Sequence, residues 1–458
     1  MLEIGRQWQR TCGGLHRRAF LQVGASSVLG MSLCDLLRVR ALGAEVTTPV
    51  RARSVIMLWL WGGPSQLDTW DMKPNAPLEY RGPFSPIATS VPGTKVCELF
   101  PNVARLTHEL AIIRSLRTGS NDHGVAGTIG LTGSSSGAVD LGGKAKAGSA
   151  RPALGSIVAR ARGYKEGLPP FMVVGGKLHQ GKKAIIGEGG GPLGPQYDPF
   201  RLEYDPRVGT KIPALKLQAE LAPERLEDRR NLLREFDDLR RNLDEAQRAQ
   251  ALDQYRSQAF AMLTAPAAQA MFDLGQERNS LRDRYGRTRF GQSCLLARRL
   301  VEAGVPFVQV NWSDHVEAEE DSGDGGWDHH YRNFQIMQDR HAPWLDQALS
   351  ALLIDLKERG LLETTLVIAL GEFGRSPKIN DKAGREHWEH CYSAILAGGG
   401  VRGGLVYGES DKRAEHPRTH PCTPADIVAT VQHCVGISSE QAQSLNLATE
   451  GSVIEALF

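Results

Sequence analysis

Val55-Ile56-Met57-Leu58-Trp59-Leu60-Trp61 is a continuous run of apolar residues, and it stops at Gly62-Gly63-Pro64. A run of this length without polar alternation is typical of a β-strand that is buried on both faces. The glycines and the proline then predict a loop at the carboxyl end of the strand, where α/β proteins place functional groups. The same signature recurs along the chain at 110–113, 171–174, 305–310, 365–370 and 393–396.

Helical patterns lie between several of these predicted strands. Residues 293–303 form one amphipathic stretch, which ends at Gly304 just before a predicted strand. A second stretch, 344–356, carries its leucines and alanines on one face and stops at Gly360. Strands that alternate with helices in this way predict an α/β fold, with a mostly parallel central sheet flanked by helices on both faces.

Two stretches interrupt this alternation. Residues 175–211 are rich in glycine and proline, which predicts a long surface loop or lid. The segment from about 219 to 290 is dense in charged residues and leucine, and it predicts a charged helical insertion. Such an insertion is usually a solvated face with a narrow apolar seam, and a specific binding role is the alternative.

The N-terminal segment has the features of an export signal. Arg17-Arg18 precede an apolar stretch, 23–37, that is shorter than the roughly 20 residues of a membrane-spanning helix. Small residues at 41–44 suit a signal peptidase. We therefore expect a twin-arginine signal over 1–44, a mature α/β domain over 45–458, a periplasmic or cell-envelope location and no stable membrane span. The alternative is an ordinary basic amphipathic N-terminus.

Composition narrows the classes of partner. The formal net charge is +2 over 458 residues, so the sequence indicates neither a nucleic-acid partner nor a membrane surface. The chain has 7 cysteines, an odd count without short regular spacing, which is neither a disulfide framework nor a zinc ribbon. One or two disulfide bridges remain compatible with this pattern, and the oligomeric state stays open.

Four polar clusters follow predicted strands. The first is the turn after the opening strand, which holds Asp68 and Asp71. The second, Asn121-Asp122-His123-Gly124, begins a predicted helix, and a helix N-terminus favours a bound anion. The third and fourth clusters are the acidic run 314–324 with Asp328, His329 and His330, and the group of Glu372, Arg375, Arg385, His387 and His390.

Carboxylates and imidazoles that lie two or three residues apart in a loop are plausible ligands for zinc, manganese or iron. A glutamate at the end of a buried strand, such as Glu372, must meet a cation, which is either a metal ion or Arg375 in a structural pair. Four polar clusters on one face of one sheet favour a functional site over independent structural features. We therefore expect convergence, at one end of the sheet, of the side chains of His123, Asp328, His330, Glu372 and His387.

Six motifs carry a resemblance that covers Ser54 to about Phe458. They are GGPSQLDTWDMKP (62–74), NDHGVAGTIGLTG (121–133), GWDHH (326–330), LGEFGRSPKIN (370–380), GREHW (384–388) and AGGGVRGG (397–404). Together they resemble the exported proteins grouped as domain of unknown function 1501, a branch of the alkaline phosphatase and sulfatase superfamily. The resemblance implies an alkaline phosphatase-like fold. Where sulfatases carry a Cys or Ser nucleophile, this chain has His123, and their late Asp-His-Gly corresponds here to Glu372-Phe373-Gly374.

The resemblance also implies a metal-dependent hydrolase of an anionic ester, phosphate or sulfate, in a small or polysaccharide-type substrate. His123 would be an additional ligand, a general acid or base, or a nucleophile, and Arg375 and Arg385 would clamp the anionic group. The competing hypothesis is a non-catalytic envelope module that binds or scaffolds and keeps the fold without the nucleophile. In the first hypothesis a divalent cation (zinc, manganese or calcium) is bound by Asp68, Asp328, His330, Glu372 and His387.

Overall fold

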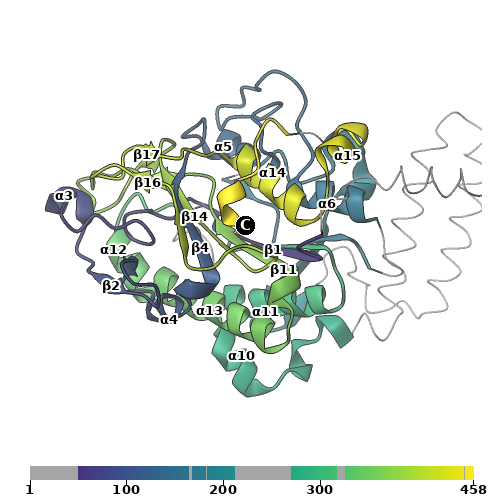
Figure 1. Ribbon diagram of the computed structural model, residues 1–458, viewed down its shortest axis with the longest axis horizontal. Helices are drawn as coiled ribbons and strands as arrows, with labels where there is room; N and C mark the ends of the chain where they lie inside the picture. The colour runs from purple at the N-terminus through teal and green to yellow at the C-terminus, as the bar shows by residue number, and fades with distance from the viewer. Residues whose placement is uncertain (1–49, 164–167, 182, 212–269, 317–324, 448) are drawn as a thin grey trace, which may run out of the picture. The chain divides into compact units, whose positions relative to one another are not determined.

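The computed structural model describes residues 50–163, 168–181, 183–211, 270–316, 325–447 and 449–458. The predicted signal, 1–44, lies outside these residues, and so does most of the predicted helical insertion. The described residues form a central sheet with helices on both of its faces (Figure 1).

The sheet is mixed but mostly parallel. Its 9 strands follow the order β15-β4-β14-β11-β1-β10-β5-β8-β9. β1 (Ser54–Trp59) lies in the middle and pairs in parallel with β10 (Phe307–Asn311) and with β11 (Thr365–Leu370). β14 (Tyr392–Ala397) is antiparallel to both β11 and β4 (Leu110–Leu116), so β4 runs in the same direction as β11. The remaining strands are β5 (Phe171–Val174), β8 (Phe200–Asp205), β9 (Gly209–Lys211) and β15 (Leu405–Tyr407).

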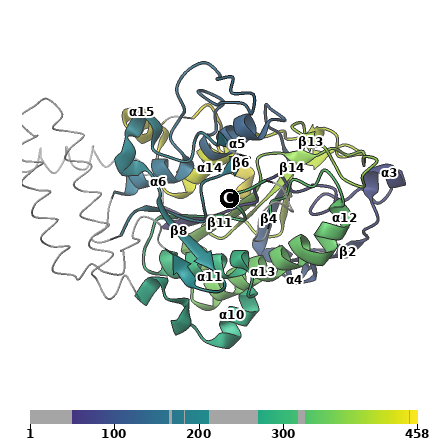
Figure 2. The ribbon, with the colours of Figure 1, turned by 180° about the vertical axis from the view of Figure 1, so that it is seen from behind.

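Successive side chains of β1 point to opposite faces of the sheet and enter separate hydrophobic cores. Ile56 and Leu58 belong to one core, and Met57 and Trp59 belong to the other. Figures 1 and 2 show the two helical layers that cover these faces. The first layer contains α4 (Pro101–Arg105), α10 (Asn279–Tyr285), α11 (Arg289–Glu302) and α13 (Ala342–Glu358), and the second contains α5 (His123–Thr132), α6 (Leu154–Arg162), α14 (Pro424–Cys434) and α15 (Ser439–Ser444).

The predicted α/β fold is confirmed, and all six predicted strands are present. The prediction of a surface loop over 175–211 is wrong for its last part, because β8 and β9 extend the sheet there. Phe200, Leu202 and Tyr204 are buried and alternate with more exposed residues, as expected for a strand near the edge of a sheet. The surrounding glycines and prolines conceal this short alternation in the sequence.

Two general features of the described residues complete the picture. Their helices are all too short or too polar to cross a membrane. Their cysteines are free and buried, so no disulfide bridge forms among Cys97, Cys294, Cys391, Cys422 and Cys434.

A candidate metal centre

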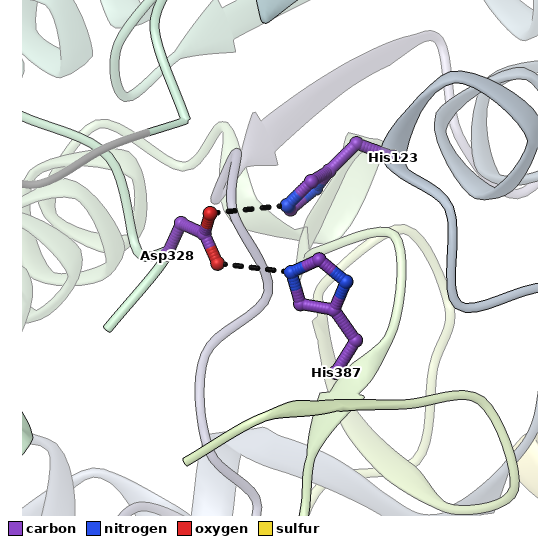
Figure 3. Close-up of side chains that lie close together, drawn as sticks. All are labelled: His123, Asp328 and His387. Carbon is purple, nitrogen blue, oxygen red and sulfur yellow. Dashed lines mark hydrogen bonds and ion pairs between the residues drawn. The ribbon is translucent and has the colours of Figure 1, made fainter. Parts of the chain in front are cut away.

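Five predicted site residues lie close together beyond the carboxyl ends of neighbouring strands. β4 leads into α5, which begins at His123, and β10 leads into the loop that carries Asp328 and His330. β11 leads to Glu372 and then to a hairpin of β12 (Gly374–Arg375) and β13 (His387–Trp388). Because these strands run in one direction, their following loops meet at one edge of the sheet. Figure 3 shows His123, Asp328 and His387 facing one another.

α5 holds His123 in a defined position. The Oδ1 atom of Asp122 accepts a hydrogen bond from Val125 N at 3.1 Å and so caps the first turn of the helix. The helix also lies very close to β1, because a Cβ atom on Gly130 would come within 2.4 Å of the Trp59 ring. The imidazole of His123 is completely buried, so both the cap and the packing fix its place.

The carboxylate of Asp328 lies at the centre of the cluster. Its Oδ2 atom is 3.3 Å from His123 Nε2, and its Oδ1 atom is 2.9 Å from His330 Nε2 and 3.1 Å from His387 Nε2. The last two nitrogen atoms are themselves 2.9 Å apart. The donor atoms of His123, Asp328 and His387 all lie within 4.8 Å of one another.

The other ring nitrogen of each histidine is held by a hydrogen-bond acceptor. Because carboxylates and carbonyl groups only accept, each Nδ1 atom carries the hydrogen. The Nε2 atom of each ring, which faces Asp328, is left to bind a cation. This outer hydrogen bond is the usual way to fix the tautomer and ring orientation of a metal-ligating histidine. The pairs are His123 Nδ1 with Glu372 Oε1 at 2.6 Å, His387 Nδ1 with the carbonyl oxygen of Asn121 at 2.7 Å, and His330 Nδ1 with Glu386 Oε2 at 2.6 Å.

Burial and neighbouring charges move the pKa values of these groups apart. Burial alone lowers the pKa of His123, but the carboxylates of Asp328 and Glu372 outweigh it and raise this pKa to about 9. Burial lowers the pKa of His387 to about 4, and the positive charge of Arg375 acts in the same direction. Against the effect of burial, Arg375 and His123 hold the pKa of the Asp328 carboxyl well below its usual range. With no cation bound, His123 thus carries a proton on each ring nitrogen, and a divalent cation would replace the proton on Nε2, which faces Asp328.

The donor set fits a divalent cation. Imidazole nitrogens combined with a carboxylate are typical ligands of zinc and manganese, whereas calcium prefers oxygen ligands. His123 Nε2 is a buried nitrogen whose carboxylate neighbour is Asp328 Oδ2, at 3.3 Å, an ion-pair contact without a well-aligned hydrogen bond. The donor atoms lie within 4.8 Å of one another, and two ligands with bonds near 2.1 Å to one ion lie at most about 4.2 Å apart, so small side-chain movements bring the three groups onto one ion.

Glu372 is placed to orient a ligand rather than to be one. Its Oε1 atom accepts from His123 Nδ1 at 2.6 Å and from the backbone N–H of Gly62 at 3.0 Å. Its Oε2 atom accepts from the same N–H group at 3.2 Å. We therefore correct the sequence-based assignment of Glu372 from metal ligand to the partner that holds the ring of His123.

Replacing Glu372 with Gln should lower the affinity for Zn²⁺ about 10- to 100-fold, the usual effect of losing an outer hydrogen-bond partner of a metal ligand. A neutral amide is a weaker acceptor than the carboxylate for the two N–H groups that converge there. Titration with Zn²⁺ against a competing chelator measures the change. Glu363→Gln, at an exposed glutamate before the same strand, should bind like the wild type. Wild-type affinity in Glu372→Gln would contradict the orienting role.

Arg375 is engaged within the protein. The side chain is buried, and its Nη2 atom lies 2.6 Å from Asp328 Oδ1. Its three nitrogen atoms also donate to the backbone carbonyl groups of Gly62, Gly63 and Arg385. The sequence-based expectation that Arg375 clamps a substrate anion is therefore corrected, because its guanidinium neutralises Asp328 and ties down the loop after β1.

Arg385 and Asp68 form a separate buried pair. Arg385 Nε lies 2.7 Å from Asp68 Oδ2, and Nη2 lies 3.1 Å from Oδ1. Asn333 also donates to this carboxylate, at 3.0 Å. The expectations that Asp68 binds the cation and that Arg385 clamps an anion are corrected, because a buried carboxylate and a buried guanidinium satisfy each other.

Sequence reasoning missed two acceptors that complete the centre. Glu386 directly precedes His387 in the same motif, and its acidic side chain was a usable signal. The carbonyl group of Asn121 gave no signal, since every residue carries one. Pairing of this kind depends on the tertiary structure.

Several solved structures are similar to this chain. The PsFucS1 sulfatase from Pseudoalteromonas sp. has a TM-score of 0.37 and 15% identity, over 91% of this chain and 76% of that one. The phosphonate monoester hydrolase of Agrobacterium radiobacter has a TM-score of 0.34 and 12% identity, over 88% of this chain and 77% of that one. The C-terminal periplasmic domain of EcEptC from Escherichia coli, in complex with Zn, has a TM-score of 0.35 and 9% identity, over 85% and 84%.

Comparison with curated proteins gives no match. A family model does match, and it covers residues 52–458, which is nearly all of the described chain. The motifs at the strand ends and the residues of the candidate metal centre all lie within this range. The chain therefore belongs to the family described as protein of unknown function DUF1501.

Proposed function

We propose that the protein is a metal-dependent hydrolase of an anionic ester, of the phosphate or sulfate class. The ligands of the cation are the Nε2 atoms of His123, His330 and His387 and the carboxylate of Asp328. The observation that carries the proposal is the common orientation of the three imidazoles toward this carboxylate, at 2.9 to 3.3 Å, with each Nδ1 atom held by an acceptor. Histidines that bind a metal almost always donate their other N–H group in this way.

The charges at the centre suit an anionic substrate. The buried groups Asp328, Glu372 and Arg375 sum to one negative charge, so a divalent cation leaves this buried part of the centre positive, and the carboxylate of Glu386 lies at the exposed side. The N-terminus of α5 adds a partial positive charge beside His123. When bound, the cation supplies Lewis-acid polarisation of an ester oxygen.

The chain's own residues hold the centre on one side and leave it open on another. His123 and Glu372 are completely buried, which excludes water behind the cluster. The side chains of His330 and His387 are 34% and 19% exposed, so a substrate reaches the centre from their side. Glu386, which is 57% exposed, holds His330 at this entrance.

Metal analysis and turnover test the proposal. Purified protein should contain about one zinc or manganese ion per chain, and removal by a chelator should be reversible. The loaded protein should hydrolyse a generic aryl phosphate or aryl sulfate, and the chelated protein should not. Failure to bind Zn²⁺, Mn²⁺ or Ca²⁺ would refute the metal centre.

A second candidate is a metal-containing binding module without catalytic activity. The observation in its favour is that Arg375 and Arg385 are fully engaged within the protein, which leaves neither guanidinium for an anionic substrate. Stoichiometric cation binding together with no turnover of either ester class would favour this candidate over the hydrolase.

A further inference from the structure

The residues around the candidate cation come mainly from two segments, which we call the first ligand loop (325–333) and the second ligand loop (380–388). The backbones of the loops are hydrogen-bonded to each other. Arg385 N donates to the carbonyl oxygen of His329 at 3.0 Å, and Asn333 N donates to that of Ala383 at 3.0 Å. Contact between the loops is close, since a Cβ atom on Gly384 would lie 2.1 Å from the carbonyl group of His330. A displacement of one loop therefore moves the other.

A row of buried side chains runs below the first ligand loop. Asn333 Nδ2 donates to Asp68 Oδ2 at 3.0 Å, and Asn333 Oδ1 is 2.9 Å from His329 Nδ1. His329 Nε2 is in turn 2.8 Å from His341 Nδ1. None of these four residues is more than 2% exposed. Water cannot replace any of these hydrogen bonds, so their geometry is fixed by the protein alone.

The carboxylate of Asp68 sets the direction of every hydrogen bond in this row. Because a carboxylate only accepts, the amide of Asn333 must turn its NH₂ group toward Asp68 and its oxygen toward His329. His329 Nδ1 must then donate, and His329 Nε2 accepts from His341. A single buried charge therefore fixes the amide orientation and the histidine tautomers.

The same carboxylate also binds the second ligand loop. Arg385 approaches Asp68 with two nitrogen atoms, at 2.7 and 3.1 Å, in the side-by-side geometry that gives the most specific orientation. His387 follows Arg385 by two residues on this loop. Asp68 thus lies at the junction of the two loops, with Asn333 on one side and Arg385 on the other.

The order of residues in the first ligand loop explains how Asp68 affects the cation ligands. His329 lies between Asp328 and His330 in the chain. His329 points into the buried row, and its neighbours Asp328 and His330 both face the cluster. The position of His329 therefore determines where its two neighbours lie.

We propose that Asp68 is a positioning residue of the metal centre, which holds the two ligand loops in the arrangement where Asp328, His330 and His387 meet. This inference rests on the metal centre of the proposed function. It assigns Asp68 a role at a distance from the cation, through Asn333 and Arg385.

Asp68→Asn keeps the shape of the side chain and removes its charge. Its affinity for Zn²⁺, measured against a competing chelator, should fall about 10- to 100-fold. Hydrogen–deuterium exchange of the metal-free protein should become faster in both ligand loops. The matched control is Asp355→Asn. Asp355 is equally buried and pairs with Arg298 at 2.8 Å, but its partners belong to the helical layer of α10, α11 and α13.

The outcomes separate the inference from the proposed function. Wild-type zinc affinity and wild-type exchange in Asp68→Asn would overturn the positioning role, and so would equal losses in Asp355→Asn. If the wild type itself binds no cation, the proposed function fails, and faster exchange confined to the two loops still supports the role of Asp68. If Asp68→Asn does not fold, Asn333→Asp replaces it, since that variant can no longer donate to Asp68. It should lose about 10-fold in zinc affinity, and unchanged affinity would overturn the inference.

Discussion

Replacing Asp328 with Asn should lower the affinity for Zn²⁺ by more than about 100-fold, beyond the range for outer hydrogen-bond partners. Asp328 provides the carboxylate that lies within 3.3 Å of the Nε2 atoms of all three histidines. Asn has the same shape but no charge, and its amide nitrogen cannot bind a cation. Hydrolysis of phosphate or sulfate esters should disappear together with the bound metal. Zinc titration against a chelator and turnover assays measure the two effects.

A double variant separates the loss of a metal ligand from the loss of folding stability. Asp328→Asn leaves the guanidinium of Arg375 buried without its carboxylate, which should cost about 3 to 5 kcal/mol of folding free energy. The double variant Asp328→Asn/Arg375→Met removes that unpaired charge and should regain part of the stability but none of the zinc affinity. The control is Asp314→Asn. Asp314 also follows β10, and its side chain is 36% exposed, so this variant should match the wild type in stability and zinc affinity. Zinc binding by the double variant would contradict the assignment of Asp328 as a ligand.

Gly62→Ala should affect both stability and the metal centre. Gly62 has φ +108, and a Cβ atom there would lie 2.5 Å from the backbone nitrogen atoms of Trp327 and Asp328. Backbone strain and overpacking should each cost about 1 to 3 kcal/mol. Because the collision is with the backbone of Asp328, zinc affinity should also fall at least about 10-fold, as it does when a ligand loses its support. Chemical denaturation and zinc titration measure the two losses.

Gly93→Ala isolates the effect of backbone conformation. Gly93 has φ +84, but a Cβ atom there meets nothing within 4 Å. This variant should lose only about 1 kcal/mol, from strain alone, and should bind zinc like the wild type. A loss of similar size in both variants would show that the close approach of Gly62 to the Asp328 loop is unimportant.

The fold was largely predictable because its strands are buried on both faces. Apolar runs such as 55–61 and 365–370 can be recognised without any knowledge of their neighbours. The strand Phe200–Asp205 was not predicted, because near the edge of a sheet only every second residue is apolar and the flanking glycines indicate a loop. The antiparallel direction of Tyr392–Ala397 is also absent from its own composition, since pairing direction depends on the connections.

The candidate site was predictable as a set of residues, but their roles were not. The rule that loops meet at the carboxyl ends of parallel strands brought His123, Asp328, His330 and His387 together. Whether a buried carboxylate binds a cation, a histidine or an arginine depends on contacts between distant segments. Glu372 and Asp68 are both acidic residues after buried strands, yet one holds a histidine and the other holds Arg385.

The central place of β1 has a consequence for the order of synthesis. Its partners are distant in the chain, since Val55 pairs with Phe307 and Ser54 pairs with Thr365. At ribosomal rates of about 5 to 20 residues per second, this apolar strand waits roughly 10 to 60 s for its first neighbour. During that time every nascent chain carries an unpaired apolar segment that is prone to aggregate. A cell that makes this protein must therefore shield its N-terminal third, and overexpression that exceeds this shielding should yield inclusion bodies.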